Sequence, residues 1–134
     1  MTQGTTALDL MVQMSASETR AAAAEALAAR LGARRLLLLV RDPELNVLVP
    51  APGFPQTLRA GSAWRSLLSR CATPGRHSAD VDLPKGTSQS AVALAVPQAV
   101  IVLLGGAPIE SELTLVERLF PMLAATLIAE QRAS

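Results

Sequence analysis

The end of the chain constrains the fold more than any other part of it. Residues 88–96 and 99–104 are two apolar stretches with only Pro97 and Gln98 between them, which predicts antiparallel strands joined by a tight turn. A Gly-Gly pair at 105–106 then interrupts the pattern, and a helix of about twenty residues is predicted over residues 110–130. This helix is apolar on two sides, whereas a sheet of this size covers only one side. We therefore expect the second side to contact another partner, most simply a second copy of the chain.

Two apolar stripes run along this final helix. The first follows alternating steps of three and four residues and forms a heptad-like seam: Leu113, Val116, Phe120, Leu123 and Leu127. The second stripe lies beside it and consists of Leu115, Leu119 and Met122. We predict that the seam forms a homodimer interface together with Leu8 and Met11 of a short first helix. The alternative is a single helix that packs the seam on its own sheet, and in either case Pro121 is expected to kink the helix.

Local signals predict the other elements. A helix is expected over residues 5–14, and the sequence Ser15-Ala-Ser-Glu18 has the form of a capping box for a second, Ala-rich helix over residues 15–31. Gly32 supplies the stop of that helix. A further helix over residues 62–71, capped by Ser62, is inserted between strands. The predicted strands cover residues 34–40, 45–49, 77–83, 88–96 and 99–104.

These elements describe one α+β domain over all 134 residues. We expect an antiparallel sheet of five to six strands over residues 34–104, interrupted by the inserted helix. The N-terminal helices and an exit helix over residues 110–131 should pack on one face of the sheet. No internal repeat or linker divides the chain.

Composition excludes several classes of function. The 12 basic and 11 acidic residues leave a net charge of +1, which argues against a nucleic-acid partner. One cysteine and one histidine are too few for a zinc site, a disulfide framework or a hydrolase triad, so we expect neither a cofactor nor an enzyme. Residues 1–10 do not resemble a signal peptide, and the apolar runs are too short to span a membrane. We therefore expect a cytoplasmic protein without a membrane partner.

The candidates for ligand contact lie around the inserted helix. They are Trp64, Arg65, Cys71, Arg76 and His77. Trp64 offers the one large aromatic platform, and His77 can form hydrogen bonds or titrate near neutral pH. The arginines, with Arg59 and Arg70 beside them, can neutralise an anionic ligand. The alternative is structural: Trp64 and Cys71 pack on the sheet, and the charged side chains and His77 are solvated.

Taken together, the pattern resembles the GAF domain family, PAS-like sensory domains of bacterial signalling proteins. The resembling stretches are residues 31–42, 45–53, 64–76 with the Gly75-Arg76 pair, 91–104 with Pro97, and 112–130. This resemblance implies a GAF/PAS-like sheet and a sensory or regulatory role, for example in a histidine kinase. A homodimer would then pass a signal through the exit helix to a downstream output domain outside this chain.

The resemblance also bears on the ligand. The stretch between the second and third strands, residues 51–77, is short, and in the family this stretch roofs the ligand pocket. A small pocket, or none, is therefore implied. Cys71 lacks the following histidine of bilin-binding relatives, and a single cysteine cannot complete the cycle of the methionine sulfoxide reductases. Two hypotheses remain: a sensor for a small molecule, or a ligand-free dimerisation module with a degenerate pocket.

Overall fold

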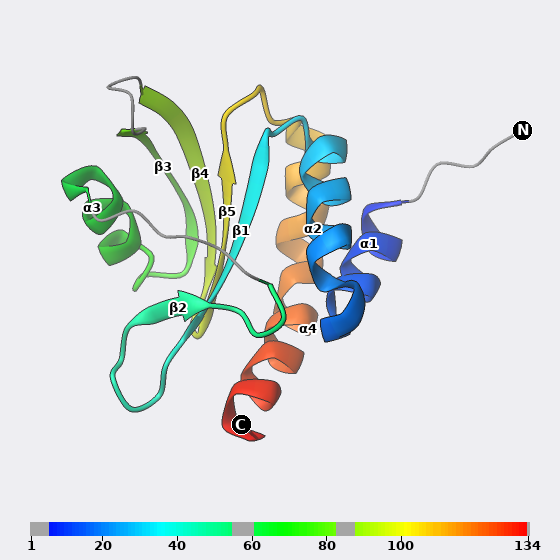
Figure 1. Cartoon of the computed structure of the whole chain (residues 1–134). Coiled ribbons are helices and arrows are strands. Elements are labelled where there is room, and N and C mark those ends of the chain that lie inside the picture. The colour runs from blue at the N-terminus through cyan, green and yellow to red at the C-terminus, as the bar shows by residue number, and fades with distance from the viewer. Residues whose placement is uncertain (1–5, 55–60, 83–87, 134) are drawn as a thin grey trace, which may run out of the picture.

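The structure, a computed structural model, describes residues 6–54, 61–82 and 88–133. These residues form an α+β fold with four helices and a five-stranded antiparallel sheet (Figure 1). The elements are α1 (Ala7–Met14), α2 (Ser17–Leu31), β1 (Arg35–Arg41), β2 (Leu48–Pro50), α3 (Ser62–Arg70), β3 (Gly75–Asp82), β4 (Ser88–Val96), β5 (Ala99–Leu104) and α4 (Glu110–Ala133). The predicted order of helices and strands is confirmed.

The sheet has the strand order β2-β1-β5-β4-β3, and every neighbouring pair is antiparallel. The central strand is β5, which pairs with β1 on one side and with β4 on the other. All its residues are buried because both faces of the sheet are covered at this strand. This burial explains why β5 is a continuous apolar run rather than an alternating one.

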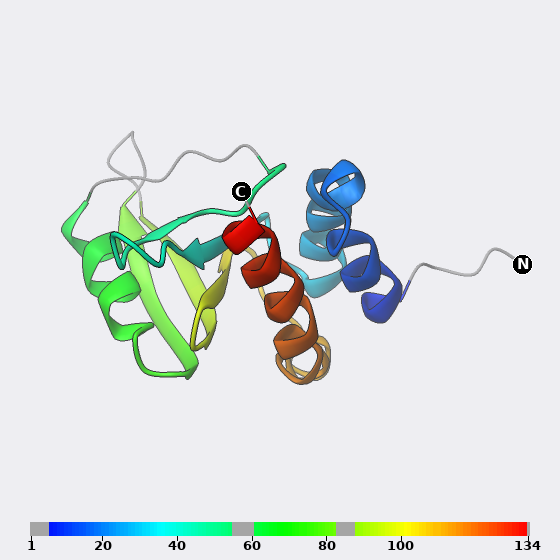
Figure 2. The same ribbon diagram turned by 90° about the horizontal axis from the view of Figure 1, so that it is seen from below.

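Helices cover both faces of the sheet, but unequally (Figure 2). The face covered by α2 and α4, on which α1 packs in turn, receives Leu36, Leu38 and Val40 of β1, whereas Leu37 and Leu39 point to the face covered by α3. This division follows from the alternation of side chains along a strand. The prediction that the N-terminal and C-terminal helices pack on one face is confirmed.

The connection from β5 to α4 passes close to the end of α2, which explains the glycines there. Gly32 ends α2 in the left-handed region with φ of 81°, and its carbonyl oxygen accepts a hydrogen bond from the backbone N–H of Ala107 at 2.9 Å. A Cβ atom on Gly106 would lie 2.1 Å from the same oxygen. Gly106 therefore permits a close backbone approach that a larger residue would prevent.

The predicted capping box at Ser15 is wrong. Ser15 is instead the C-cap of α1, where its hydroxyl donates to the carbonyl oxygen of Val12 at 2.5 Å, and α2 begins after Ala16 without a side-chain cap. The capping box lies at the start of α1, where Thr6 and Asp9 exchange side-chain and backbone hydrogen bonds. Ser15 does not cap α2 because α2 begins at Ser17, which puts the N-cap position at Ala16.

The expected strand over residues 45–49 is displaced to Leu48–Pro50. The carboxylate of Asp42 accepts hydrogen bonds from the backbone N–H groups of Glu44 and Leu45, and Asn46 has a positive φ of 56°. These contacts hold residues 42–47 as a loop. Leu45 is therefore 71 % exposed rather than part of the sheet.

Other helix and strand boundaries differ from the predicted ones by a few residues. The N-cap of α3 is Gly61, with Ser62 as the first helical residue, and no side-chain cap is present. The predicted strand over residues 77–83 begins earlier, because β3 pairs with β4 from Gly75 onward. Residue 83 lies outside the described residues. The final helix α4 continues through Pro121 to Ala133.

Candidate functional site

Two of the predicted ligand residues lie inside the core beneath α3. Trp64 and Cys71 are buried in a cluster with Leu67 of α3 and Val81 of β3. Burial raises the pKa of the Cys71 thiol, which lowers its reactivity. The indole N–H of Trp64 is buried without a hydrogen-bond partner among the described residues. Both side chains are therefore surrounded by packed apolar neighbours, as the structural alternative predicted.

Arg76 lies on the opposite face of the sheet and binds α4. Its guanidinium forms ion pairs with Glu110 at 2.7 Å and with Glu117. The hydrogen bonds to Glu117 and Glu110 raise the pKa of Arg76. Because two carboxylates already neutralise this charge, the structure does not support Arg76 as a ligand contact.

The remaining candidates are also dispersed. Arg65 is exposed on α3, and Arg59 lies outside the described residues. Arg70 donates to the carbonyl oxygen of Ser78 at 3.0 Å. A ring nitrogen of His77 lies 2.8 Å from the carbonyl oxygen of Thr73. The structure therefore does not bring the five predicted residues together as one site.

The predicted dimer seam lies inside this chain's own core. Its five members are buried against the sheet and against α1 and α2: Leu113, Val116, Phe120, Leu123 and Leu127. Met11 is buried with them, whereas Leu8 is exposed. The alternative, a helix that packs the seam on its own sheet, describes this arrangement. The seam is consequently not available to a second chain, and a dimer interface has to use other residues.

The second stripe of α4 is the one that reaches the surface. Leu115 is 40 % exposed, and Met122 is 69 % exposed and lies beside the exposed Leu8 and Val12 of α1. Between the two helices lies a hollow of about 160 Å³, here called the α1/α4 groove. It is lined by Leu8, Met11, Val12 and Ser15 from the α1 side and by Leu119, Met122, Leu123 and Thr126 of α4. All of these lining residues are uncharged.

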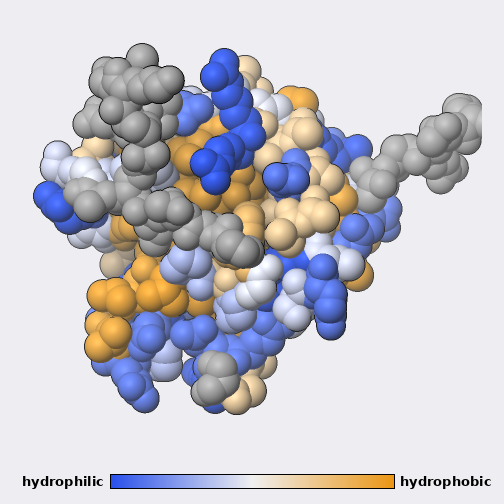
Figure 3. All heavy atoms as spheres, viewed as in Figure 1, coloured by the Kyte–Doolittle hydropathy of each residue, from blue (hydrophilic) through white to orange (hydrophobic). Residues whose placement is uncertain are grey.

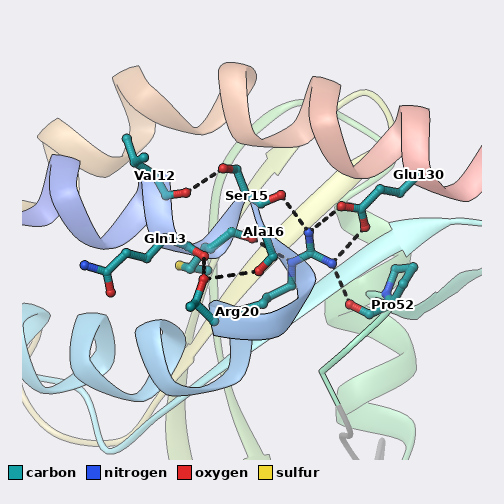
Figure 4. Close-up of polar contacts among 9 residues, drawn as sticks. Val12, Gln13, Ser15, Ala16, Arg20, Pro52 and Glu130 are labelled. Carbon is teal, nitrogen blue, oxygen red and sulfur yellow. Dashed lines mark hydrogen bonds and ion pairs between the residues drawn. The ribbon is translucent and has the colours of Figure 1, made fainter.

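A buried polar cluster adjoins this groove at Ser15, and its contacts are drawn in Figure 4. The Arg20 guanidinium is fully buried and faces the Glu130 carboxylate, with Nη2 to Oε1 at 2.8 Å and Nη1 to Oε2 at 2.9 Å. The other N–H groups of the guanidinium donate hydrogen bonds to three backbone carbonyl oxygens: those of Met14 at 2.6 Å, Pro52 at 2.6 Å and Ser15 at 3.1 Å. We call these five residues the Arg20 cluster. All five N–H donors of the guanidinium are thereby satisfied.

Arg20 is not among the residues predicted for a site, although the sequence carries a signal for it. Arg20 is the first member of the buried stripe of α2, followed by Ala23, Ala24 and Leu27 at helical spacing. A charged residue in a stripe that is otherwise apolar is rarely buried unless it is paired. The position of its partner, Glu130, could not be read from the sequence because 110 residues separate the two.

The surface also carries apolar side chains away from the helices. Figure 3 shows an apolar area at the lower left, over the connection between β1 and β2, where Leu45 and Val47 are exposed. A wider, open hollow of about 450 Å³ lies between α2 and the start of β1, with Arg34, Arg35 and Glu25 among its lining residues. Neither feature includes a residue that the sequence analysis proposed as a contact.

Comparisons of the chain with protein-family models, with curated proteins and with solved structures found no match. The resemblance to GAF domains therefore stays a prediction. Within residues 6–54, 61–82 and 88–133, no group of three or more His, Cys, Asp or Glu side chains is placed to hold a metal ion. In the same part of the chain, no helix is both long enough and apolar enough to cross a membrane.

Proposed function

We propose that this chain is a dimeric regulatory domain that passes a change of state through α4. The exposed stripe of Leu8, Val12, Leu115 and Met122 beside the α1/α4 groove carries the proposal. Grouped apolar side chains on a protein surface mark interaction sites more often than scattered ones do. The dimer predicted from the sequence is thus retained, with its interface moved from the buried seam to this stripe.

The spacing of the exposed residues of α4 supports a second copy of the chain as the partner. Seven of the exposed residues recur at alternating steps of four and three: Ser111, Leu115, Arg118, Met122, Ala125, Ala129 and Arg132. If two such helices cross antiparallel about Met122, Leu115 of one copy lies opposite Ala129 of the other. A large side chain then faces a small one on both sides of the two-fold axis, as a self-complementary interface requires.

The regulatory role rests on the resemblance to GAF domains. By this resemblance, the chain is a cytoplasmic sensory or regulatory domain of a bacterial signalling protein, for example a sensor histidine kinase. In the proposal α4 leads toward the output domain, and the chain itself catalyses no reaction. A signal would change the packing of α1 against α4. These two helices form the proposed dimer interface, and α4 is the helix that leads to the output domain.

A ligand-free interaction module is the second candidate function. The packed cluster of Trp64, Leu67 and Cys71 beneath α3 favours it, because these side chains fill the space below the inserted helix. Native mass spectrometry separates the two candidates. A retained small molecule that is lost on denaturation supports the sensor, whereas a dimer of bare chains supports the module.

The dimer interface is tested by two neighbouring substitutions on α4. We expect the wild-type chain to sediment as a dimer in analytical ultracentrifugation. Met122→Glu should give a folded monomer, because a charge is placed in the interface but remains solvated in the monomer. Leu123→Glu should instead unfold the chain, because Leu123 is buried in the core.

Leu45→Glu is the matched control for this experiment. Leu45 is 71 % exposed, close to the 69 % of Met122, but it lies in the loop between β1 and β2. The control should leave the dimer intact. A wild-type monomer at high concentration, or a Met122→Glu variant that is still dimeric, would contradict the proposed interface.

A further inference from the structure

We propose that the Arg20 cluster is a latch that couples the C-terminal end of α4 to the joint between α1 and α2. The role of the latch in regulation rests on the proposed function. The joint opening of the two segments does not depend on it. In this structure the latch is closed, with the guanidinium between the Glu130 carboxylate and three backbone carbonyl groups (Figure 4). In the open state, the last turns of α4 and the joint between α1 and α2 would separate together.

The geometry places one guanidinium, that of Arg20, in contact with three segments that are distant in sequence. Its guanidinium contacts the end of α1 through the carbonyl oxygens of Met14 and Ser15, and the segment after β2 through Pro52. It contacts α4 through Glu130, which is followed by only the last turn of the helix. A displacement of any one segment therefore removes a hydrogen-bond acceptor from the same buried group.

Charge explains why these segments should open together. Within the part of the chain that the structure describes, Glu130 is the only acidic side chain bonded to the Arg20 guanidinium, and the Arg20 side chain has no exposed surface. If the end of α4 moved away alone, a buried cation would lose its counter-charge, which is strongly unfavourable. Arg20 must then follow Glu130 or become hydrated, and in both cases it releases the carbonyl groups of Met14 and Ser15. The cluster is therefore either wholly closed or wholly open.

The α1/α4 groove places the proposed partner directly beside the latch. Ser15 lines the groove, and its carbonyl oxygen accepts a hydrogen bond from Arg20. Thr126 lines the opposite wall one helical turn before Glu130. The proposed partner helix crosses α4 at Met122, which also lines the groove, and would thus brace both sides of the latch in the closed arrangement. Partner binding and latch closure should consequently favour each other.

Hydrogen–deuterium exchange on a Glu130→Gln variant tests the latch. The substitution keeps the size of the side chain but removes its charge. We expect faster exchange, by about tenfold or more, both in residues 126–133 and in residues 12–20, as a two-state coupling of ordinary size would give. Exchange in β4 and β5 should stay as in the wild type, because local opening leaves the sheet folded.

Glu112→Gln is the matched control, because it makes the same chemical change in the first turn of the same helix, where Glu112 pairs with Arg30 at 3.3 Å. It should leave exchange unchanged in both latch segments. If Glu130→Gln accelerates exchange only at the end of α4, or in neither segment, the latch is refuted. If that variant does not fold, Glu130→Asp replaces it, and the same joint acceleration is required.

A second measurement separates the latch from the proposed function. If the groove binds a second copy, Glu130→Gln should raise the dissociation constant of the dimer by about fivefold or more. An unchanged dissociation constant would refute the coupling between groove and latch. If the wild-type chain proves monomeric, the proposed dimer fails, and the exchange experiment alone decides the latch.

Discussion

Three arginines bind glutamates of α4, and the surroundings of two of them, Arg20 and Arg76, differ. Arg20 is fully buried at its ion pair with Glu130, whereas the Arg76 side chain is 32 % exposed beside Glu110 and Glu117. Water screens the pairs of Arg76 and can replace them, so each contributes little to stability. The buried guanidinium of Arg20 has no such substitute, because solvent does not reach it.

We expect this difference to appear in the free energy of unfolding. Arg76→Ala should lower it by less than about 1 kcal/mol, as for other partly exposed ion pairs. Arg20→Ala should lower it by about 3 kcal/mol or more, because it leaves buried carbonyl groups and a carboxylate without their partner. Urea denaturation followed by circular dichroism measures both values. Equal losses for the two variants would show that burial does not set the contribution of these pairs.

At the scale of the element, α4 has two apolar stripes with different roles. The stripe that includes Leu127 packs on the sheet, whereas the stripe that includes Leu115 faces outward. Both stripes follow helical spacing, so their chemistry in the sequence is similar. The difference arises because the helix can press only one side against the sheet.

Leucine-to-alanine substitutions on the two stripes should therefore differ in cost. Leu127→Ala removes a fully buried side chain and should lower the free energy of unfolding by about 2–5 kcal/mol. Leu115→Ala should change the stability of the monomer by less than about 1 kcal/mol, because Leu115 is partly exposed. These values are best measured by urea denaturation in a Met122→Glu background, so that dimer dissociation does not contribute. A large loss for Leu115→Ala would mean that this stripe also supports the monomer.

At the scale of the whole molecule, the surface proposed to join two copies is apolar around Met122, and the two charged members of the α4 stripe, Arg118 and Arg132, have the same sign and cannot pair with each other. The residues that line the α1/α4 groove are uncharged, and the charged clusters of Arg20 and Arg76 are satisfied within the chain. Association through such a surface depends on burying apolar area rather than on attraction between charges. The balanced net charge of +1 adds little repulsion between copies.

The dimer should accordingly be insensitive to salt. We expect its dissociation constant to change by less than about threefold between 0.05 and 0.5 M NaCl, a range over which screening weakens charged contacts strongly. Sedimentation equilibrium at several salt concentrations measures this. A dimer that dissociates as salt is added would indicate that charged groups, and not the apolar stripe, hold the copies together.

Local sequence patterns determined the secondary structure and the α+β class of this protein. The Ala-rich run of α2, the apolar strands β4 and β5, and the Gly105-Gly106 break before α4 each predicted their element from neighbouring residues alone. These signals succeed because helix propensity, side-chain alternation and glycine conformation act over a few residues. The placement of the terminal helices on one face followed from the order of the elements.

Only the tertiary structure decided which groups meet. It turned the heptad-like stripe of α4 toward the sheet, moved the exposed surface to Leu115 and Met122, and separated Arg76 from Trp64 and Cys71. It also paired Arg20 with Glu130 across 110 residues. Burial and pairing depend on how distant segments pack in three dimensions, and a one-dimensional pattern of apolar residues is compatible with more than one such packing.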